Sequence, residues 1–202
     1  MTKAVWSVTA RLAILGVALA AVSCGEQTRQ GQASSYLIIR TLEAASGATP
    51  SEFSSILSSD VITVVDGNAT VFGDPARVTF SLGLKDPGPP TSPTTPSPNQ
   101  FITVDRYRVT YVRADGRNTP GVDVPYPFDG AFTVTVGGDA SAGFTLVRTQ
   151  AKGEAPLLAL VRNGLVISTI AEITFYGHDQ TGREVSALGR ISVNFANFGD
   201  PD

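Results

Sequence analysis

The chain has 202 residues, with 15 lysines and arginines against 18 aspartates and glutamates, and a formal net charge of −3. This weakly acidic balance excludes the class of nucleic-acid-binding proteins that depend on a basic surface. A single cysteine excludes an internal disulfide. One cysteine and one histidine are also too few for a zinc site built from several Cys and His ligands.

The first 23 residues have the features of a secretory signal peptide. Lys3 and Arg11 provide a positive start, and residues 12–22 (LAILGVALAAV) follow without a charge. This apolar run is shorter than the roughly 20 residues that a stable membrane-spanning helix needs. We therefore predict a signal peptide over residues 1–23 rather than a permanent transmembrane helix.

Residues Ala21-Val22-Ser23-Cys24 resemble the lipobox of bacterial lipoprotein signal peptides. The resemblance implies cleavage before Cys24, a diacylglyceryl thioether on its thiol and acylation of its amine. Several acyl chains anchor a protein stably at a membrane, where one is marginal. In a Gram-negative host, Gly25 in place of aspartate favours the outer over the inner membrane. The alternative is an ordinary signal peptide that leaves Cys24 as an unpaired thiol.

Residues 24–35 (CGEQTRQGQASS) are predicted to be the lipidated cysteine followed by a flexible tether, because they contain no large apolar residue. Loss of the signal peptide removes two basic residues and the only tryptophan, Trp6. The mature chain then has 13 basic and 18 acidic side chains and a net charge of −5. Residues 36–202 are long enough for one domain with its own core.

Alternation of apolar and polar residues predicts about eight strands in residues 36–202. Residues 36–42 form the first, and 61–72 form a hairpin that turns at Asp66-Gly67-Asn68. A change of parity between Val104 and Tyr107 predicts a β-bulge near Asp105. The residues expected to point into the core are Val78, Phe80, Leu82, Leu84, Tyr107, Val109, Tyr111, Phe132, Val134, Val136, Phe144, Leu146, Ala171, Ile173, Phe175, Ile191, Val193 and Phe195.

Two short helices and one stiff loop interrupt the strands. Thr49-Pro50-Ser51-Glu52 has the pattern of a capping box with proline at the first helical position, and predicts a helix carrying Phe53, Ile56 and Leu57. Residues 156–163 predict a second helix, with a proline start and an Asn-Gly end. Residues 86–100 hold six of the 13 prolines and predict an exposed loop rich in polyproline conformation.

The order of these elements resembles an immunoglobulin-like or fibronectin-type-III-like β-sandwich. The segments LVISTIAEITFYGHDQTGREV and ISVNF resemble the closing hairpin of such a domain, with helix 156–163 in the connection before it. The resemblance implies an all-β, antiparallel Ig-like sandwich with two short helices. The Cys…Trp…Cys core of antibody domains is absent, which excludes that subtype. A jelly roll is the alternative architecture.

Residues 113–130 (RADGRNTPGVDVPYPFDG) predict a long ordered loop between two strands, and such loops often carry function. The aspartates are candidate ligands for calcium, which takes carboxylate and carbonyl oxygens. The EF-hand spacing is missing, however, and the Asp-Gly pairs also fit plain turns. The candidate contact residues are Asp115, Arg117, Asp123, Tyr126, Phe128 and Asp129, with Asp115, Asp123 and Asp129 as the possible calcium ligands.

We expect no catalytic activity and no cofactor. The chain has no G-x-S-x-G elbow, and His178, the only histidine, lies at a predicted hairpin tip. We expect a membrane-anchored lipoprotein of the cell envelope whose domain is a non-enzymatic structural or protein-interaction module with an envelope protein as partner. The alternative is a surface module that binds a glycan or calcium through loop 113–130.

Overall fold

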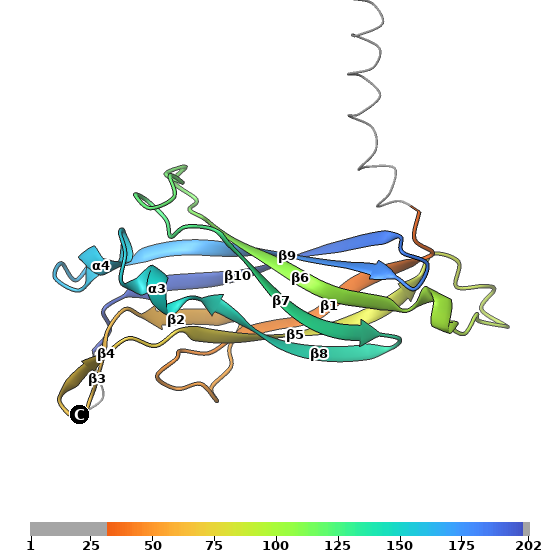
Figure 1. The fold of residues 1–202 in the computed structure, drawn as a ribbon, viewed down its shortest axis with the longest axis horizontal. Helices are drawn as coiled ribbons and strands as arrows, with labels where there is room; N and C mark the ends of the chain where they lie inside the picture. The colour runs from red at the N-terminus through yellow and green to blue at the C-terminus, as the bar shows by residue number, and fades with distance from the viewer. Residues whose placement is uncertain (1–31, 200–202) are drawn as a thin grey trace, which may run out of the picture.

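The computed structural model describes residues 32–199, which form a mostly β protein (Figure 1). The predicted signal peptide, Cys24 and the tether up to residue 31 lie outside the described residues. The folded part includes the last residues of the predicted tether, because Ala33 and Ser35 are buried. No helix in residues 32–199 is long and apolar enough to cross a membrane.

The described part of the chain contains ten strands, one 3-10 helix and two short α-helices. They are, in chain order, β1 (Ser35–Ala44), β2 (Ile56–Asp60), β3 (Thr63–Val65), β4 (Asn68–Thr70), β5 (Asp74–Leu84), η1 (Pro98–Gln100), β6 (Ile102–Val112), β7 (Phe128–Val136), β8 (Asp139–Val147), α3 (Thr149–Lys152), α4 (Leu157–Leu160), β9 (Ile167–Asp179) and β10 (Glu184–Ala196).

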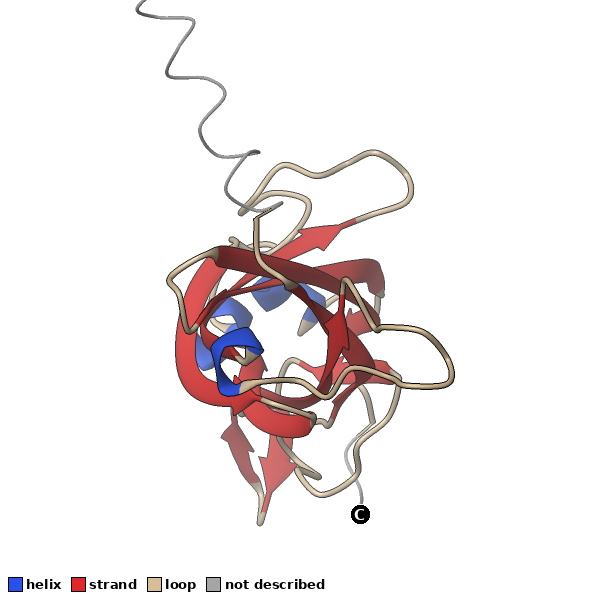
Figure 2. Cartoon of the chain, turned by 90° about the vertical axis from the view of Figure 1, so that its right-hand side faces the viewer, coloured by secondary structure: helices blue, strands red, loops and turns tan. Residues whose placement is uncertain are grey.

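Two sheets pack against each other in a sandwich-like arrangement. One sheet has the order β1-β5-β8, and the other has the order β2-β10-β9-β6-β7. Neighbouring strands are antiparallel except β2, which runs parallel to β10. β3 and β4 form a separate small hairpin. Figure 2 looks along the molecule and shows the strands arranged around a common interior, which confirms the predicted all-β, sandwich-like architecture.

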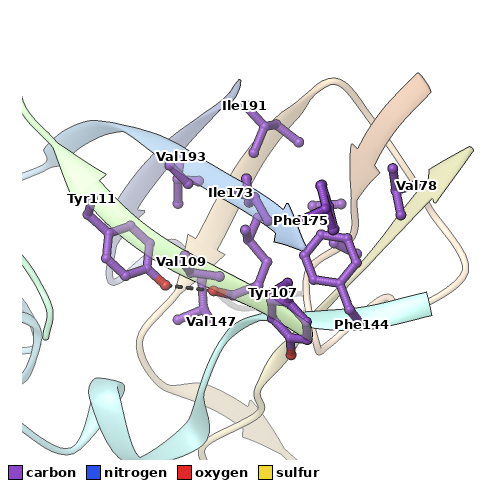
Figure 3. Packing of buried hydrophobic residues seen from close by; sticks show 14 of the residues in the cluster. Val78, Tyr107, Val109, Tyr111, Phe144, Val147, Ile173, Phe175, Ile191 and Val193 are labelled. Atoms are coloured by element: carbon purple, nitrogen blue, oxygen red, sulfur yellow. Dashed lines mark hydrogen bonds between the residues drawn. The ribbon is translucent and has the colours of Figure 1, made fainter. Parts of the chain in front are cut away.

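Aromatic side chains from both sheets fill the centre of this interior. Tyr107 of β6 and Phe175 of β9 meet Phe144 of β8, which belongs to the opposite sheet (Figure 3). The ring centroids of Tyr107 and Phe144 are 5.0 Å apart, and those of Phe144 and Phe175 are 5.4 Å apart, both edge to face. This geometry suits the ring quadrupoles. The residues expected to point inward are buried or partly buried core residues, with Leu84 at the margin.

Two local predictions are confirmed. The register of β6 shifts between Val104 and Arg106 against both β7 and β9, so the predicted bulge at Asp105 brings Val104 and Tyr107 onto the same buried face. In the β3–β4 hairpin Val65 pairs with Asn68. The two turn residues have positive φ, 51° at Asp66 and 75° at Gly67, as a two-residue type I′ turn requires.

The prediction of a helix that begins at Thr49 and carries Phe53, Ile56 and Leu57 is wrong. The capping-box residues form a single turn, in which the Glu52 amide donates to the Thr49 carbonyl over 3.1 Å. The chain then becomes extended, and Ile56–Asp60 pairs with β10 as strand β2. Within β2, Leu57 is buried while Ile56 is exposed. Pairing with β10 and burial of alternate side chains therefore override the local helix signal.

The helix predicted at residues 156–163 is present as α4, which is one turn long and lies between β8 and β9. The second helix is α3, immediately before it, which the sequence did not predict. α3 has only four residues, too few for an amphipathic period to be visible. Its last residue, Lys152, is 1% exposed.

A buried ion pair holds α3 against the start of β5. Lys152 Nζ lies 2.8 Å from Asp74 Oδ1, and both side chains are at most 1% exposed. Asp74 Oδ2 accepts a bond from the Ser59 hydroxyl at 2.5 Å, and Oδ1 accepts one from the Gly47 amide at 2.8 Å. Burial raises the pKa of Asp74, whereas Lys152 and the two hydrogen bonds oppose that rise. One carboxylate thus connects four separate segments of the chain.

Removing only one member of this pair should be strongly destabilising. We expect Lys152→Met to lower the free energy of unfolding by about 3–5 kcal/mol, because Asp74 would stay buried without a counter-charge. The double variant Lys152→Met, Asp74→Leu should lose less than the single variant. Urea unfolding followed by circular dichroism measures both. The control is Arg77→Ala, which breaks the exposed Arg77–Glu43 pair and should cost at most about 1 kcal/mol. Equal losses for Lys152→Met and Arg77→Ala would contradict the prediction.

Candidate functional site

The two ends of the sandwich are different. Ser35, where β1 begins, pairs with Leu84 at the end of β5, and the Ser35 hydroxyl donates to the Gln100 carbonyl at 2.9 Å. Asp74 begins β5, eleven residues long, at the other end. At about 3.3 Å per residue these ends lie roughly 33 Å apart. Figure 1 shows β1 starting beside the proline-rich loop on the right, with α3, α4 and the loop after β6 on the left.

The loop between β6 and β7 comprises residues 113–127, shorter than the predicted 113–130 because residues 128–130 pair with β6 as the start of β7. It lies at the end opposite the start of β1 and is held by its own hydrogen bonds. Asp115 accepts bonds from two arginine side chains. Its Oδ2 is 2.6 Å from Arg113 Nη2 and 2.8 Å from Arg117 Nη2. The backbone amide of Arg117 also donates to Asp115 Oδ1 over 3.1 Å. The first part of the loop is therefore closed around one carboxylate.

The arginines keep Asp115 ionised under acidic conditions. Hydrogen bonds from Arg113 and Arg117 hold the pKa of Asp115 well below its usual value of 3.8. A carboxyl group with a lowered pKa contributes its stabilisation above the unfolded-state pKa and loses it only as the pH falls through the folded-state pKa. The contribution of Asp115 to the order of the loop should therefore be complete above pH 3.8 and decline progressively as the pH falls below that value.

A tight turn orders the second part of the loop. The Thr119 carbonyl accepts bonds from the amides of Val122 at 3.1 Å and Asp123 at 2.8 Å. Asp123 Oδ2 in turn accepts a bond from the Thr119 amide at 3.1 Å. Gly121 has φ 76°, and the ring of Tyr126 lies so close over it that no β-carbon would fit. The turn therefore favours glycine at this position for its positive φ, and a β-carbon would also have to displace the Tyr126 ring.

The loop combines buried anchors with exposed apolar groups. Val124 and Phe128 are buried and attach the loop to the domain. Val122 is 67% exposed, and Tyr126 is 51% exposed although its ring packs on Gly121. The side chain of Arg117 is 65% exposed. The loop thus presents an apolar, an aromatic and a cationic group from an ordered backbone.

A cavity of about 530 Å³ lies at the base of this loop. Its lining includes Phe128 and Asp129 at the start of β7, Tyr107 of β6, Thr145 of β8, and Arg148 directly after β8. The cavity therefore joins two of the residues predicted from the sequence with residues distant in the chain. Arg148 was not predicted, because it is one arginine after a strand, without a motif around it.

Among the described residues, Arg148 packs against the aromatic ring of Phe128 and has no carboxylate ion-pair partner. Its guanidinium carbon lies 4.7 Å from the centroid of the Phe128 ring. Its Nε is buried and has no hydrogen-bond acceptor among the described residues. Asp129, which lines the same cavity, is instead paired with Arg108, with Asp129 Oδ2 and Arg108 Nη1 2.9 Å apart. Arg148 thus lines the cavity without forming an ion pair with any carboxylate of residues 32–199.

The three aspartates predicted as possible calcium ligands have separate partners. Asp115 bonds Arg113 and Arg117, Asp123 bonds the Thr119 amide, and Asp129 bonds Arg108. Residues 32–199 contain no group of three or more His, Cys, Asp or Glu side chains placed to hold a metal ion. The described structure therefore does not bring these three aspartates together as a calcium site.

His178 lies near the tip of the β9–β10 hairpin, as predicted. Its Nδ1 is 3.4 Å from Asp105 Oδ2, and both side chains are about half exposed. Across the described chain, no serine or threonine hydroxyl forms a hydrogen bond with His178. The hairpin turn itself is ordered by Asp179, whose Oδ1 accepts bonds from the Thr181 and Arg183 amides.

Comparisons with known proteins give no family for this chain. No protein-family model matches it, and no curated protein matches it. A solved structure titled "X-ray structure of Northeast Structural Genomics Consortium target SoR45" aligns over 81% of this chain and 86% of its own, with 11% identity and a TM-score of 0.36. That similarity is too low to carry an argument about fold or function.

The Asp115 contacts should control the order of loop 113–127. We expect Asp115→Ala to speed tryptic cleavage after Arg113 and Arg117, because the loop loses the acceptor that joins them. The melting temperature should hardly change, since the network is exposed. Mass spectrometry of a timed digest measures the cleavage. The control, Asp129→Ala, removes another exposed acid paired with arginine but leaves the loop closed. Equal cleavage rates in the two variants would contradict the prediction.

Proposed function

We propose that this chain is a membrane-anchored envelope lipoprotein whose β-sandwich is a non-enzymatic protein-interaction module. One observation carries the proposal. Loop 113–127 is ordered by internal hydrogen bonds, displays Arg117, Val122 and Tyr126, and lies at the end of the sandwich opposite the start of β1. An anchor at Cys24 would therefore leave this end pointing away from the membrane.

The exposed groups of the loop are suited to a protein partner. Tyrosine and arginine are enriched among the residues that dominate the energy of protein interfaces. A loop that is ordered before binding also loses less conformational entropy when the partner arrives. The apolar residues Leu158, Leu165 and Val166, in and after α4, are 51–61% exposed and add contact area at the same end of the sandwich.

We further propose that the sandwich is Ig-like. The order β10-β9-β6-β7 corresponds to strands G, F, C and C′ of such a domain, and β1-β5-β8 corresponds to strands A, B and E. The helices α3 and α4 then fall in the E–F connection. This correspondence supports the immunoglobulin-like assignment over a jelly roll.

Lipidation at Cys24 can be tested directly. We expect the wild-type protein in its bacterial host to incorporate an alkyne-labelled fatty acid and to fractionate with the membranes, because the lipobox cysteine is the acceptor. Cys24→Ser should lose the label and the membrane association. The control, Ser23→Ala, keeps a small residue before the cysteine and should retain both. Labelling of Cys24→Ser to the wild-type level would contradict the prediction.

The interaction can be tested by photocrosslinking on whole cells. We expect a photoreactive amino acid at Val122 to capture a stoichiometric envelope protein, because this side chain is exposed on the ordered loop. The same probe at Ser92, in the proline-rich loop at the other end, should capture little of it. A C-terminal tag, purification and mass spectrometry identify the product. Recovery of the lipid-bound protein alone from the Val122 variant would contradict the proposal and favour a small ligand.

A further inference from the structure

We propose that the cavity at the base of loop 113–127 binds a carboxylate group of the protein partner, with the Arg148 guanidinium as its main ligand. This inference rests on the proposed function and names the chemistry of one contact. It starts from Arg148, which lines the cavity and has no carboxylate partner in the described chain. Its Nε is closed to solvent, so a ligand in the cavity would meet the terminal nitrogens of the guanidinium.

The charges around the cavity leave one positive charge uncompensated. Asp74 is paired with Lys152 at 2.8 Å, and Asp129 is paired with Arg108 at 2.9 Å. Arg148 lines the same cavity and has no carboxylate partner in the described chain. A single negative charge balances this arrangement. A phosphate, which carries more negative charge, would exceed the one unpaired cation.

The shape of the guanidinium also fits a carboxylate. The guanidinium carbon lies over the Phe128 ring, 4.7 Å from its centroid, and this contact restricts the movement of the guanidinium. A planar guanidinium presents parallel N–H donors that match the two oxygens of a carboxylate. Two polar residues, Thr149 and Gln150, line the cavity as well. An acidic side chain or a C-terminal carboxylate of the partner fits these groups, while the exposed loop residues contact the surface around it.

The first test uses the purified domain and acetate as the probe. In spectra of protein labelled with ¹⁵N-arginine, the Nε–H signal of Arg148 is identified by its loss in Arg148→Lys. We expect this signal to shift saturably with acetate and not with sodium chloride at equal ionic strength. The signal of the exposed Arg162 is the internal control. A shift at Arg148 no larger than at Arg162 would overturn the proposal, as would a stronger response to phosphate than to acetate.

The second test asks whether the carboxylate belongs to the partner. The photoreactive group at Val122 is combined with Arg148→Lys, which keeps the charge but loses the planar fork, and with Arg162→Lys as the control. We expect capture to fall about tenfold or more with Arg148→Lys, because a charge-assisted bond is lost. Urea unfolding of each variant must first show an intact fold, and Arg148→Gln serves if Arg148→Lys fails this check.

The outcomes separate this inference from the proposed function. Capture by the wild type and equally by Arg148→Lys would overturn the carboxylate contact and leave the interaction module standing. Capture by neither, with the acetate shift present at Arg148, would overturn the partner as its source and assign the cavity to a small carboxylate. Capture by neither and no selective shift would overturn both.

Discussion

The buried Asp74–Lys152 pair is the interaction on which the end of the sandwich with the cavity depends. Asp74 begins β5, Lys152 ends α3, Ser59 belongs to β2 and Gly47 follows β1. A carboxylate removed from water must be matched by charge and hydrogen bonds, or the fold loses several kcal/mol. Because its partners come from separate segments, this requirement fixes their relative positions. Arg148 is four residues before Lys152 and enters the cavity from the segment so fixed.

The aromatic centre and the ion pair act at different places in the molecule. Tyr107, Phe144 and Phe175 join the two sheets in the middle, where area removed from water supplies the stabilisation. Tyr111, further along β6, donates to the Leu146 carbonyl at 2.6 Å (Figure 3) and links the sheets again, toward α3. Burial raises the pKa of Tyr111 far above its usual value of 10, so it remains a donor. The ordered end is thus built on side chains that bridge the sheets.

Loop 113–127 is ordered by its own hydrogen bonds and buried anchor residues. Its exposed side chains are not needed to hold its backbone in place. Asp115 and Thr119 close the backbone by local bonds, and Val124 and Phe128 anchor it to the core. Val122 and Tyr126 are consequently exposed on a backbone that does not need a partner to become ordered. Phe128 has two roles: it anchors the loop to the core, and its ring packs against the Arg148 guanidinium. The cavity and the loop surface therefore share one structural base.

The sequence by itself determined most of the strands, the bulge at Asp105, the Asp66-Gly67 turn and helix α4, because alternation, parity and turn chemistry are local properties of the chain. It also marked loop 113–130 by its composition. Only the tertiary structure decided that Ile56–Asp60 is a strand, because its pairing with β10 joins residues more than 130 positions apart. The same holds for the Asp74–Lys152 pair and for Arg148 beside Phe128. The alternation of apolar and polar side chains can be read from neighbouring residues in the sequence. Charged residues that meet only through folding have no fixed spacing in the sequence, so their pairing cannot be read from it.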